Sequence, residues 1–247
     1  MITDSFDNSS NAIINPKRKK DLVNCDICIA SFSNKIERFL IDNYNPQKVG
    51  NFKCVNGEYP IYLFKYKNKK IGFYKTLLGA PASVGVLEEV SAILDTKKFL
   101  VFGSAGSLDK NICNNKIVVP TYAYRDEGTS YHYAKAEDYI KIKNSAIVTS
   151  LMAKNKIPFV EGKVWTTDAF YRETKNNFNK RKSEGCIAVD MECSAMQAVC
   201  NFRNLELFYF LVSGDILDDL KWGDSELHSA NHNFNNFEIA LRLASEL

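Results

Sequence analysis

The sequence of 247 residues lacks any apolar run near the length of a membrane span, and no apolar segment of a signal peptide follows its basic cluster at Lys17–Lys20. We therefore expect a cytoplasmic protein with no membrane partner. A long basic stripe interleaved with aromatic residues is also missing, since 32 basic and 29 acidic residues leave a net charge of only +3. Nucleic acid is not an expected partner.

The seven cysteines lack the spacing of a disulfide framework, which indicates reduced and mostly buried thiols. Cys25 and Cys28 form a CxxC motif inside a strand pattern, where residues three apart point to opposite faces, so we expect no shared metal ion. His228 and His232, spaced i,i+4 on the last predicted helix, either bind a metal or lie on a solvated face. Because no third ligand is in view, we favour the solvated face and predict no metal site.

The composition, with 45% hydrophobic and 25% charged residues, is that of an ordinary globular protein. Residues 1–20, rich in Asn, Ser and Lys, predict a flexible N-terminal arm, and residues 21–247 are expected to form one domain. The apolar periodicity predicts the α/β class, as a three-layer α/β/α domain with a central mixed sheet and helices on both faces. The predicted strands cover residues 24–31, 60–66, 70–77, 99–102, 116–124, 159–166, 187–189 and 206–212, and the predicted helices cover 34–44, 81–94, 144–153, 193–199 and 224–244.

A glycine-rich segment follows the predicted strand at 99–102, and its members include Gly103 and Ser104. It has neither the GxGxxG spacing of a dinucleotide site nor the Gly-Lys-Ser/Thr of a P-loop, so no cofactor is expected. Read as a loop at the carboxyl end of a strand, the segment offers backbone N–H groups and a hydroxyl to an anion such as phosphate. A tight turn between strands is an equal alternative.

Two acids, Asp190 and Glu192, lie at the turn between a buried strand and an apolar helix, with Met191 between them. A buried carboxylate without partners costs several kcal/mol, so these residues need an explanation. One explanation is a sugar-like polyol, because a carboxylate accepts two hydroxyl hydrogen bonds and Met191 can pack on the sugar face. The other is a structural role near the helix N-terminus, where the dipole favours negative charge.

Three further regions are candidates for ligand binding. The polar and aromatic run from Arg125 to Tyr133 either binds a ligand or covers a neighbouring subunit, and His132 within it is either an acid–base group or a structural residue. Phe170 can stack on a planar base and Arg172 can donate to its carbonyl, unless Phe170 is core and Arg172 pairs with an acid. Asp215 follows the last buried strand at the ligand edge of such a sheet and is the candidate proton donor.

The ordered set of motifs resembles the nucleoside phosphorylase family, which includes uridine phosphorylase, hexameric purine nucleoside phosphorylase and the methylthioadenosine nucleosidases. The resemblance covers roughly residues 24–245 and is most similar to the uridine phosphorylase branch over Arg125–Tyr133 and Thr166–Tyr171. It implies that Met191 and Glu192 hold the ribose hydroxyls, that Phe170 stacks on the base, that Gly103 and Ser104 bind phosphate, and that Asp215 protonates the departing base.

The sequence departs from the family where phosphate arginines are expected. The segment Ala30–Asn34 has neither the glycine nor the arginine of the family's first loop, Val101 stands where another arginine precedes the Gly/Ser segment, and Glu58–Tyr62 contains none. The resemblance nevertheless implies a pentosyltransferase of nucleotide salvage that cleaves a nucleoside by phosphorolysis, with phosphate as co-substrate, to the free base and (deoxy)ribose 1-phosphate. Hydrolysis by a nucleosidase and nucleoside binding without turnover are the alternatives. The family also implies a homo-oligomer, either a dimer or a trimer of dimers.

Overall fold

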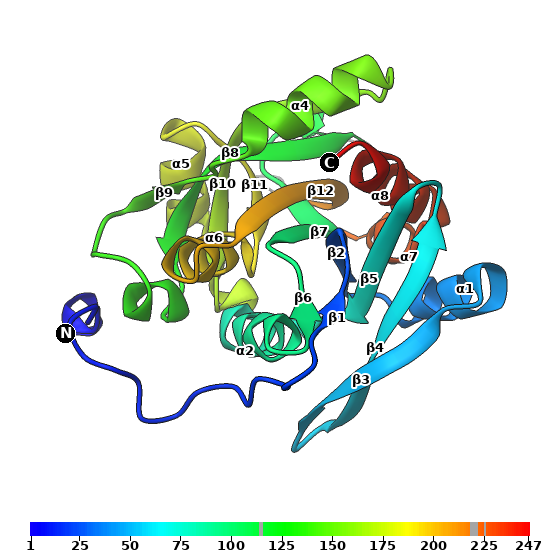
Figure 1. Cartoon of the computed structure of the whole chain (residues 1–247). Coiled ribbons are helices and arrows are strands. Elements are labelled where there is room, and N and C mark those ends of the chain that lie inside the picture. Colours follow the sequence, from blue (N-terminus) through cyan, green and yellow to red (C-terminus); the bar gives the residue numbers. More distant parts are fainter. Residues whose placement is uncertain (114–115, 218–221, 225) are drawn as a thin grey trace.

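The computed structural model describes residues 1–113, 116–217, 222–224 and 226–247, and its elements alternate between strands and helices along the chain (Figure 1). The strands are β1 (Val23–Asn24), β2 (Ile27–Ser31), β3 (Gln47–Cys54), β4 (Gly57–Tyr66), β5 (Lys69–Lys75), β6 (Leu94–Asp95), β7 (Lys98–Ser107), β8 (Ile117–Asp126), β9 (Tyr139–Lys141), β10 (Phe159–Thr167), β11 (Cys186–Asp190), β12 (Glu206–Leu217) and β13 (Trp222–Gly223). The helices are α1 (Asn34–Tyr44), α2 (Ala80–Ser91), α3 (Lys110–Cys113), α4 (Ser145–Lys154), α5 (Lys175–Ser183), α6 (Cys193–Phe202), α7 (Leu227–His232) and α8 (Phe234–Glu246), with 3-10 turns η1 (Ile2–Asp4), η2 (Thr129–His132) and η3 (Phe170–Arg172).

The strands other than β1 and β6 form one mixed sheet in the order β13-β12-β8-β10-β11-β7-β2-β5-β4-β3, with β9 attached to β8. An additional pairing of β12 with β7 closes β7, β12, β8, β10 and β11 into a ring. Strand β7 is parallel to β2 and β12 but antiparallel to β11. The predicted α/β class with a central mixed sheet is therefore confirmed, and the ring closure is an addition to it.

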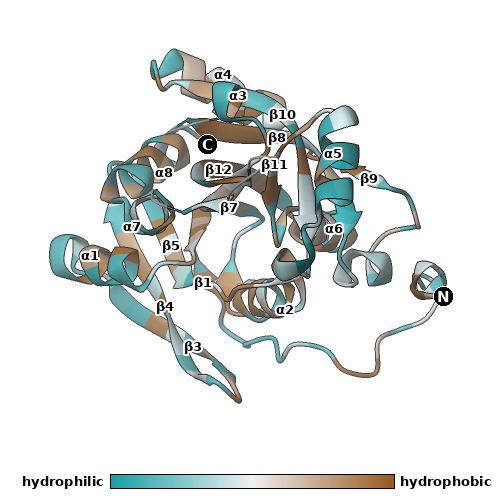
Figure 2. Cartoon of the chain, turned by 180° about the vertical axis from the view of Figure 1, so that it is seen from behind, coloured by the Kyte–Doolittle hydropathy of each residue, from teal (hydrophilic) through white to brown (hydrophobic). Residues whose placement is uncertain are grey.

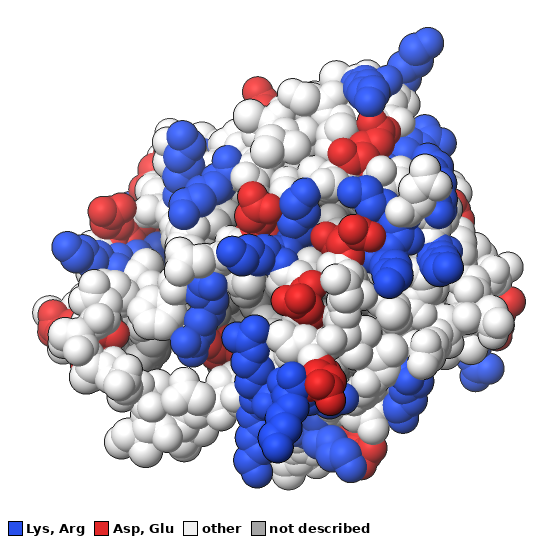
Figure 3. Space-filling view, viewed as in Figure 1, with Lys and Arg blue, Asp and Glu red and all other residues white. Residues whose placement is uncertain are grey.

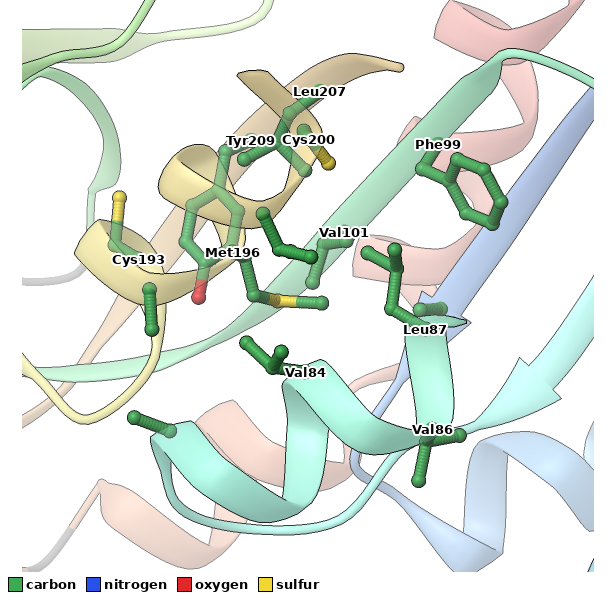
Figure 4. Packing of buried hydrophobic residues seen from close by; sticks show 14 of the residues in the cluster. Val84, Val86, Leu87, Phe99, Val101, Cys193, Met196, Cys200, Leu207 and Tyr209 are labelled. Carbon is green, nitrogen blue, oxygen red and sulfur yellow. The ribbon is translucent and has the colours of Figure 1, made fainter. Parts of the chain in front are cut away.

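The alternation of apolar residues along β7 explains why helices cover both faces of the sheet. Phe99 and Val101 belong to one buried cluster and Leu100 and Phe102 to another, because successive strand side chains point to opposite faces. Figure 4 shows the first cluster, in which side chains of α2 and α6, including Met196, meet those of β7 and β12. The second cluster includes buried side chains of α1, α4 and α8.

The surface of the molecule differs from this core in both hydropathy and charge. Figure 2 shows hydrophobic residues concentrated on the central strands, whereas α5 on the outside is largely hydrophilic. On the face seen in Figure 3, Lys and Arg side chains are interspersed with Asp and Glu, with one denser basic group at the lower edge. None of the helices in the described ranges is long and apolar enough to cross a membrane.

The segment before β1 runs along the outside of the domain beneath α2 (Figure 1) and is largely exposed. Its first residues contact the η2 region, where Ile2 Cδ1 would lie 3.2 Å from a Cβ placed on Gly128. The ring of Phe6 meets that of Phe202 edge-on at 6.5 Å between centroids. Flexibility of residues 1–20 stays a prediction, and in this structure the segment folds back onto its own domain.

The Gly/Ser segment after Phe102 was predicted as a loop, and that prediction is wrong. Residues 103–107 continue β7, with Gly103 opposite Leu211 and Ser104 opposite Val212 in parallel register with β12. The strand continues because β12 pairs with it along its whole length. On its other edge, pairing with β2 ends at Phe102 and pairing with β11 begins at Gly106, so the residues between them are bound by β12 alone.

Two other expectations also differ from the structure. The helix predicted at 224–244 is divided at Asn233, whose extended backbone separates α7 from α8 and whose side chain accepts a hydrogen bond from Asn235 N. Cys25 lies in a break between β1 and β2 and not within a strand, so its thiol and that of Cys28 lie on the same side, beside Gly72. Within the described residues, no group of three or more His, Cys, Asp or Glu side chains is arranged to hold a metal ion.

Close packing at Gly72 of β5 leads to the first prediction. A Cβ at this position would lie 2.8 Å from Leu94 Cδ1 and 3.1 Å from Cys28 Sγ. Gly72→Ala should therefore lower the free energy of unfolding, measured by chemical denaturation, by about 1 to 3 kcal/mol. The matched control is Gly85→Ala in α2, where a Cβ meets nothing within 4 Å. This control should be stabilising by about 0.5 to 1 kcal/mol, and equal effects of the two changes would contradict the packing argument.

Candidate active site

Asp190, the last residue of β11, is buried and its carboxylate is fully engaged by protein donors. It accepts hydrogen bonds from Thr166 Oγ1 (2.7 Å), Cys193 N (2.7 Å), Glu192 N (3.1 Å) and Tyr209 OH (3.3 Å). Burial raises the pKa of Asp190 to about 6, although these hydrogen bonds oppose the shift. Its side chain therefore joins β10, β12 and the start of α6, and it holds the backbone from which Glu192 projects.

Glu192, also buried, is less completely engaged. Its Oε1 accepts a hydrogen bond of 2.6 Å from the backbone N–H of Gly79, at the start of α2. Burial and then the charge of Asp190 raise the pKa of Glu192 to about 8, against hydrogen bonds from the backbone of Gly79 and Met191. A carboxylate has about four acceptor positions, so capacity for ligand hydroxyls remains. Met191 beside it is partly exposed.

Strand register brings the other candidate residues to the same edge. Strands β2, β5, β7 and β12 are mutually parallel in their pairings, so their carboxyl ends lie together. Strand β11 runs the opposite way along β7, with Ala188 opposite Ser107 and Val189 opposite Gly106. Continuing this register carries the turn at Glu192 back toward Ser104. The extrapolated register predicts that the two acids lie on the side of β7 where Gly103 and Ser104 lie.

Asp215 lies on β12 at this edge, with Oδ1 3.3 Å from a Cβ placed on Gly106 of β7. Its Oδ2 accepts a hydrogen bond of 2.8 Å from Trp222 Nε1. Burial raises the pKa of Asp215, and the Trp222 hydrogen bond opposes this. A second carboxyl, Glu173, lies within the field of Asp215. Burial, followed by the charge of Asp215, raises the pKa of Glu173 to about 7.

The aromatic residues after β10 are exposed. Phe170 in η3 is 46% exposed, with its ring centroid 4.2 Å from that of Tyr171. Phe170 is therefore not a core residue, whereas Trp165 is buried and donates to Asp126 Oδ2 at 2.9 Å. Arg172 is exposed beside them. Phe170 and Tyr171 therefore form an exposed aromatic surface just before Glu173 in the sequence.

Arg125 is buried, and its guanidinium binds its own loop. It donates to Ser130 Oγ (2.8 Å) and to the backbone carbonyls of Ala134 (3.3 Å), Lys135 (2.6 Å) and Glu137 (3.3 Å). With most of its five N–H donors occupied, little remains for a ligand. His132, in the same run, is exposed.

Helix α7 covers the Ser104 end of β7 with polar side chains. Ser104 Oγ donates to Asn231 Oδ1 at 2.6 Å. One residue on, His232 Nδ1 lies 2.7 Å from Ser33 Oγ, and His228 Nε2 lies 3.0 Å from Lys35 Nζ. The two histidine rings contact each other at 4.7 Å between centroids. His228 is exposed and His232 partly exposed, in line with the predicted solvated face, and the structure adds contacts from the pair to Ser33 and Lys35 at the start of α1.

We call Ser33, Lys35, His228, Asn231 and His232 the α7 cluster. Burial, Lys35 and His228 each lower the pKa of His232. The cluster thus brings a lysine ammonium and two histidine rings together between α7 and the start of α1. Lys35 and Asn231 were missed at the level of sequence, where only the i,i+4 spacing of the histidines gave a signal.

Comparison with known proteins assigns the family. The family model described as the phosphorylase superfamily matches residues 27–246. The chain belongs to the phosphorylase superfamily. This agrees with the resemblance to nucleoside phosphorylases drawn from the Gly103–Ser104, Asp190–Glu192 and Asp215 motifs.

Two curated relatives of this superfamily member illustrate the range of similarity. The chain is 28% identical over 166 residues to the uncharacterised protein R802 of Acanthamoeba polyphaga mimivirus. The matched region covers 66% of this chain and 65% of that protein's length. The chain is 25% identical over 182 residues to a DeoD-type purine nucleoside phosphorylase of Buchnera aphidicola. The matched region covers 71% of this chain and 76% of that relative.

Two solved structures share the superfamily member's fold. Purine nucleoside phosphorylase of Toxoplasma gondii in complex with immucillin-H matches with a TM-score of 0.76 and 16% identity over 96% of this chain and 98% of that one. Futalosine hydrolase of Helicobacter pylori matches with a TM-score of 0.71 and 17% identity over 92% and 99%. The fold is therefore shared by proteins named as phosphorylases and as hydrolases, and nearness to the uridine phosphorylase branch stays a prediction.

Three of the raised carboxyl pKa values of this superfamily member have a consequence for stability. Asp190, Glu192 and Glu173 hold their protons to a higher pH in the folded state than in the unfolded chain. Between about pH 4 and pH 8 these three carboxyls bind more protons in the folded state than in the unfolded chain. Their contribution to the free energy of unfolding therefore falls as the pH rises through this window.

Glu192→Gln should flatten this dependence, because glutamine does not titrate but keeps an acceptor for Gly79 N–H. We expect the loss of unfolding free energy between pH 5 and pH 8, measured by denaturation, to shrink by a few kcal/mol. Glu161→Gln, at an exposed position of β10, is the matched control and should leave the slope unchanged. A Glu192→Gln protein with the wild-type slope would contradict the assignment of this titration to Glu192.

Proposed function

We propose that the protein cleaves the N-glycosidic bond of a purine nucleoside by phosphorolysis, giving the free base and (deoxy)ribose 1-phosphate. The observation that carries this proposal is the buried Glu192 carboxylate, which Gly79 N–H holds with acceptor positions to spare. The purine preference draws on the relatives named purine nucleoside phosphorylase and guanosine phosphorylase.

The ribose is proposed to lie against Met191 and Glu192. A carboxylate accepts two hydroxyl groups at once, which suits the adjacent 2′- and 3′-hydroxyls of a pentose. The partly exposed Met191 side chain can pack on the apolar face of the sugar. Asp190 has no comparable capacity, because its oxygens are already engaged by protein donors, and it serves to orient Glu192.

The base is proposed to stack on Phe170, with Arg172 at the edge of the base. The carboxyl of Asp215 is proposed to lie beside the departing base. An exposed aromatic ring loses water on stacking and favours a planar ligand. In a loosened, oxocarbenium-like transition state, negative charge accumulates on the departing base, and an acid at that end stabilises it. The raised pKa of Asp215 is consistent with such an acid.

Phosphate is proposed to bind between Ser104 and the α7 cluster. Lys35 supplies an ammonium group, and Ser33, Asn231 and the two histidine rings supply further polar contacts. These groups stand in for the arginines that the family carries elsewhere. Arg125 does not replace them, because its guanidinium binds its own loop, and Arg203 pairs with Glu88.

Hydrolysis is the second candidate, favoured by one specific observation. The ring of Phe32 would lie 3.0 Å from a Cβ on Gly103, so an aromatic side chain packs where the family places its phosphate loop. Each charge-assisted contact to phosphate contributes about 1.5 to 3 kcal/mol, so the loss of several arginines weakens phosphate binding by orders of magnitude. Nucleoside binding without turnover is the third possibility. For every candidate we propose a cytoplasmic homo-oligomer with a small-molecule nucleoside as partner, no nucleic acid and no further cofactor.

A nucleoside panel tests the reaction. Inosine, guanosine, adenosine and uridine, with their 2′-deoxy forms, are incubated with the protein in the presence and absence of phosphate, and products are separated by chromatography. We expect free purine and ribose 1-phosphate only when phosphate is present. Phosphate-independent release of free ribose would select hydrolysis, and tight binding without product would select the third possibility.

Lys35→Ala tests the phosphate site. Losing one charged contact should raise the KM for phosphate by about tenfold, with a much smaller change in the KM for the nucleoside. Arg38→Ala removes another exposed cation of α1 and is the matched control. A phosphate KM that is unchanged in Lys35→Ala would rule out the α7 cluster as the phosphate site.

A further inference from the structure

Helix α6 begins without a cap from its own N-terminal residue. Glu192 is the N-cap, and its side chain makes no capping hydrogen bond, although an acceptor at this position usually binds an N–H group of the first turn. Other side chains take that role. Asp190 accepts the N–H groups of Glu192 and Cys193. Thr166 Oγ1 accepts that of Ser194 at 3.2 Å. The carboxylate of Glu192 is therefore free to point away from its own helix.

Glu127 holds the same turn of α6 from a different part of the chain. Its side chain is buried, and Oε1 accepts a hydrogen bond of 2.8 Å from the Ser194 hydroxyl. Its Oε2 accepts the backbone N–H of Ser130, in η2, at 2.9 Å. The two carboxyl oxygens therefore bind two different elements of the protein. Glu127 belongs to the polar run Arg125–Tyr133, to which the proposed function gives no role.

The loop that carries Glu127 is itself fixed by hydrogen bonds. Ser130 Oγ accepts Arg125 Nε at 2.8 Å. The Arg125 guanidinium lies over the ring of Tyr131, 4.2 Å from its centroid, and Tyr131 OH donates to Arg125 O at 3.1 Å. Because these contacts lie within the loop, Glu127 is held against α6 in a defined position.

A continuous path of hydrogen bonds leads from Glu127 to the backbone of Glu192. Ser194 donates its hydroxyl to Glu127 and its N–H to Thr166. The Thr166 hydroxyl donates to Asp190 at 2.7 Å, and Asp190 accepts Glu192 N–H at 3.1 Å. Every residue of this path is buried. A buried polar network whose members are all paired holds them in one arrangement, because breaking a contact leaves a desolvated group without a partner.

We infer that Glu127 is a positioning residue for the ribose, acting through Ser194 on the direction in which the Glu192 carboxylate points. The inference rests on the proposed function and adds to it a residue that touches no substrate. Without the Glu127 contact the first turn of α6 can shift, and the two ribose hydroxyls no longer meet the acceptors of Glu192 in line. The run Arg125–Tyr133 then serves to hold Glu127 against α6.

Paired ligands separate this role from a general structural one. Adenosine, guanosine and inosine are each compared with the 2′,3′-dideoxy form, which lacks both hydroxyls assigned to Glu192. The measured quantity is the ratio of Kd values in phosphate-free buffer, or of kcat/KM values where the protein cleaves the nucleoside without phosphate. The wild type should prefer the ribonucleoside by about 100-fold or more.

Two variants remove the contact from its two sides. Glu127→Gln offers one acceptor oxygen in place of two, and Ser194→Ala deletes the hydroxyl donor. Each should reduce the preference for the ribonucleoside about tenfold. Should Glu127→Gln fail to fold, Ser194→Ala applies the same test. The double variant should show no further loss, because both changes remove one contact.

Glu88 provides a matched control, because it holds the far ends of the same two elements. Its carboxyl accepts Tyr133 OH at 2.8 Å and Arg203 Nε at 2.6 Å. Arg203 follows the last turn of α6, about 14 Å along the helix from Ser194. Glu88→Gln should therefore lower the free energy of unfolding without changing the preference for the ribonucleoside.

A further double variant shows whether the effect passes through Glu192. In a Glu192→Gln protein, adding Glu127→Gln should change the preference by less than about threefold, since the group that Glu127 positions is already altered.

The outcomes are distinct. Three results would each overturn the positioning role and leave the proposed function intact: a preference within about threefold of wild type in the variants of the Glu127–Ser194 contact, an equal drop in Glu88→Gln, or a tenfold drop that persists in the Glu192→Gln background. A wild type that binds the nucleosides but does not prefer the ribose would overturn both the assignment of the hydroxyls to Glu192 and the positioning role. A wild type that neither binds nor cleaves any of the nucleosides would overturn the proposed function as well.

Discussion

The carboxylate of Asp190 is the interaction on which the candidate site depends. It accepts hydrogen bonds from β10 through Thr166, from β12 through Tyr209, and from the first N–H groups around the start of α6. Removing it would leave these buried donors unpaired, each at a cost of about 1 to 3 kcal/mol. The same contacts fix the backbone of residue 192. The geometry of Glu192 is therefore a consequence of how Asp190 is satisfied.

The pair of acids divides two tasks between neighbouring positions. Asp190 is satisfied by the protein, and Glu192 is held by Gly79 N–H with acceptor positions to spare. Because both are buried, the charge of one raises the pKa of the other. This repulsion is tolerated at a ligand site since hydroxyl donors from a bound sugar would relieve it. A purely structural cap of α6 would need only one of the two acids.

The sequence predicts those elements of the fold whose formation depends on residues close together in the chain. Helix α1 was predicted with its observed bounds, because Ser33 caps it and Ile36 and Leu40 give it a buried face. The continuation of β7 through Gly103 could not be predicted, since it depends on β12 and β11 closing a ring around it. The α7 cluster was equally hidden, because Lys35 and His228 are 193 positions apart. Motif order singled out Glu192 and Asp215 as candidates, and their roles stay predictions.

The α7 cluster also bears on the choice of nucleophile. An arginine offers a planar fork of five donors that matches phosphate, whereas Lys35 offers one compact ammonium. That ammonium already contacts His228, with 3.0 Å between Nζ and Nε2. A phosphate bound here would have to displace or share this contact, whereas water as the nucleophile would leave it in place. The choice of nucleophile therefore depends on whether phosphate can compete for Lys35.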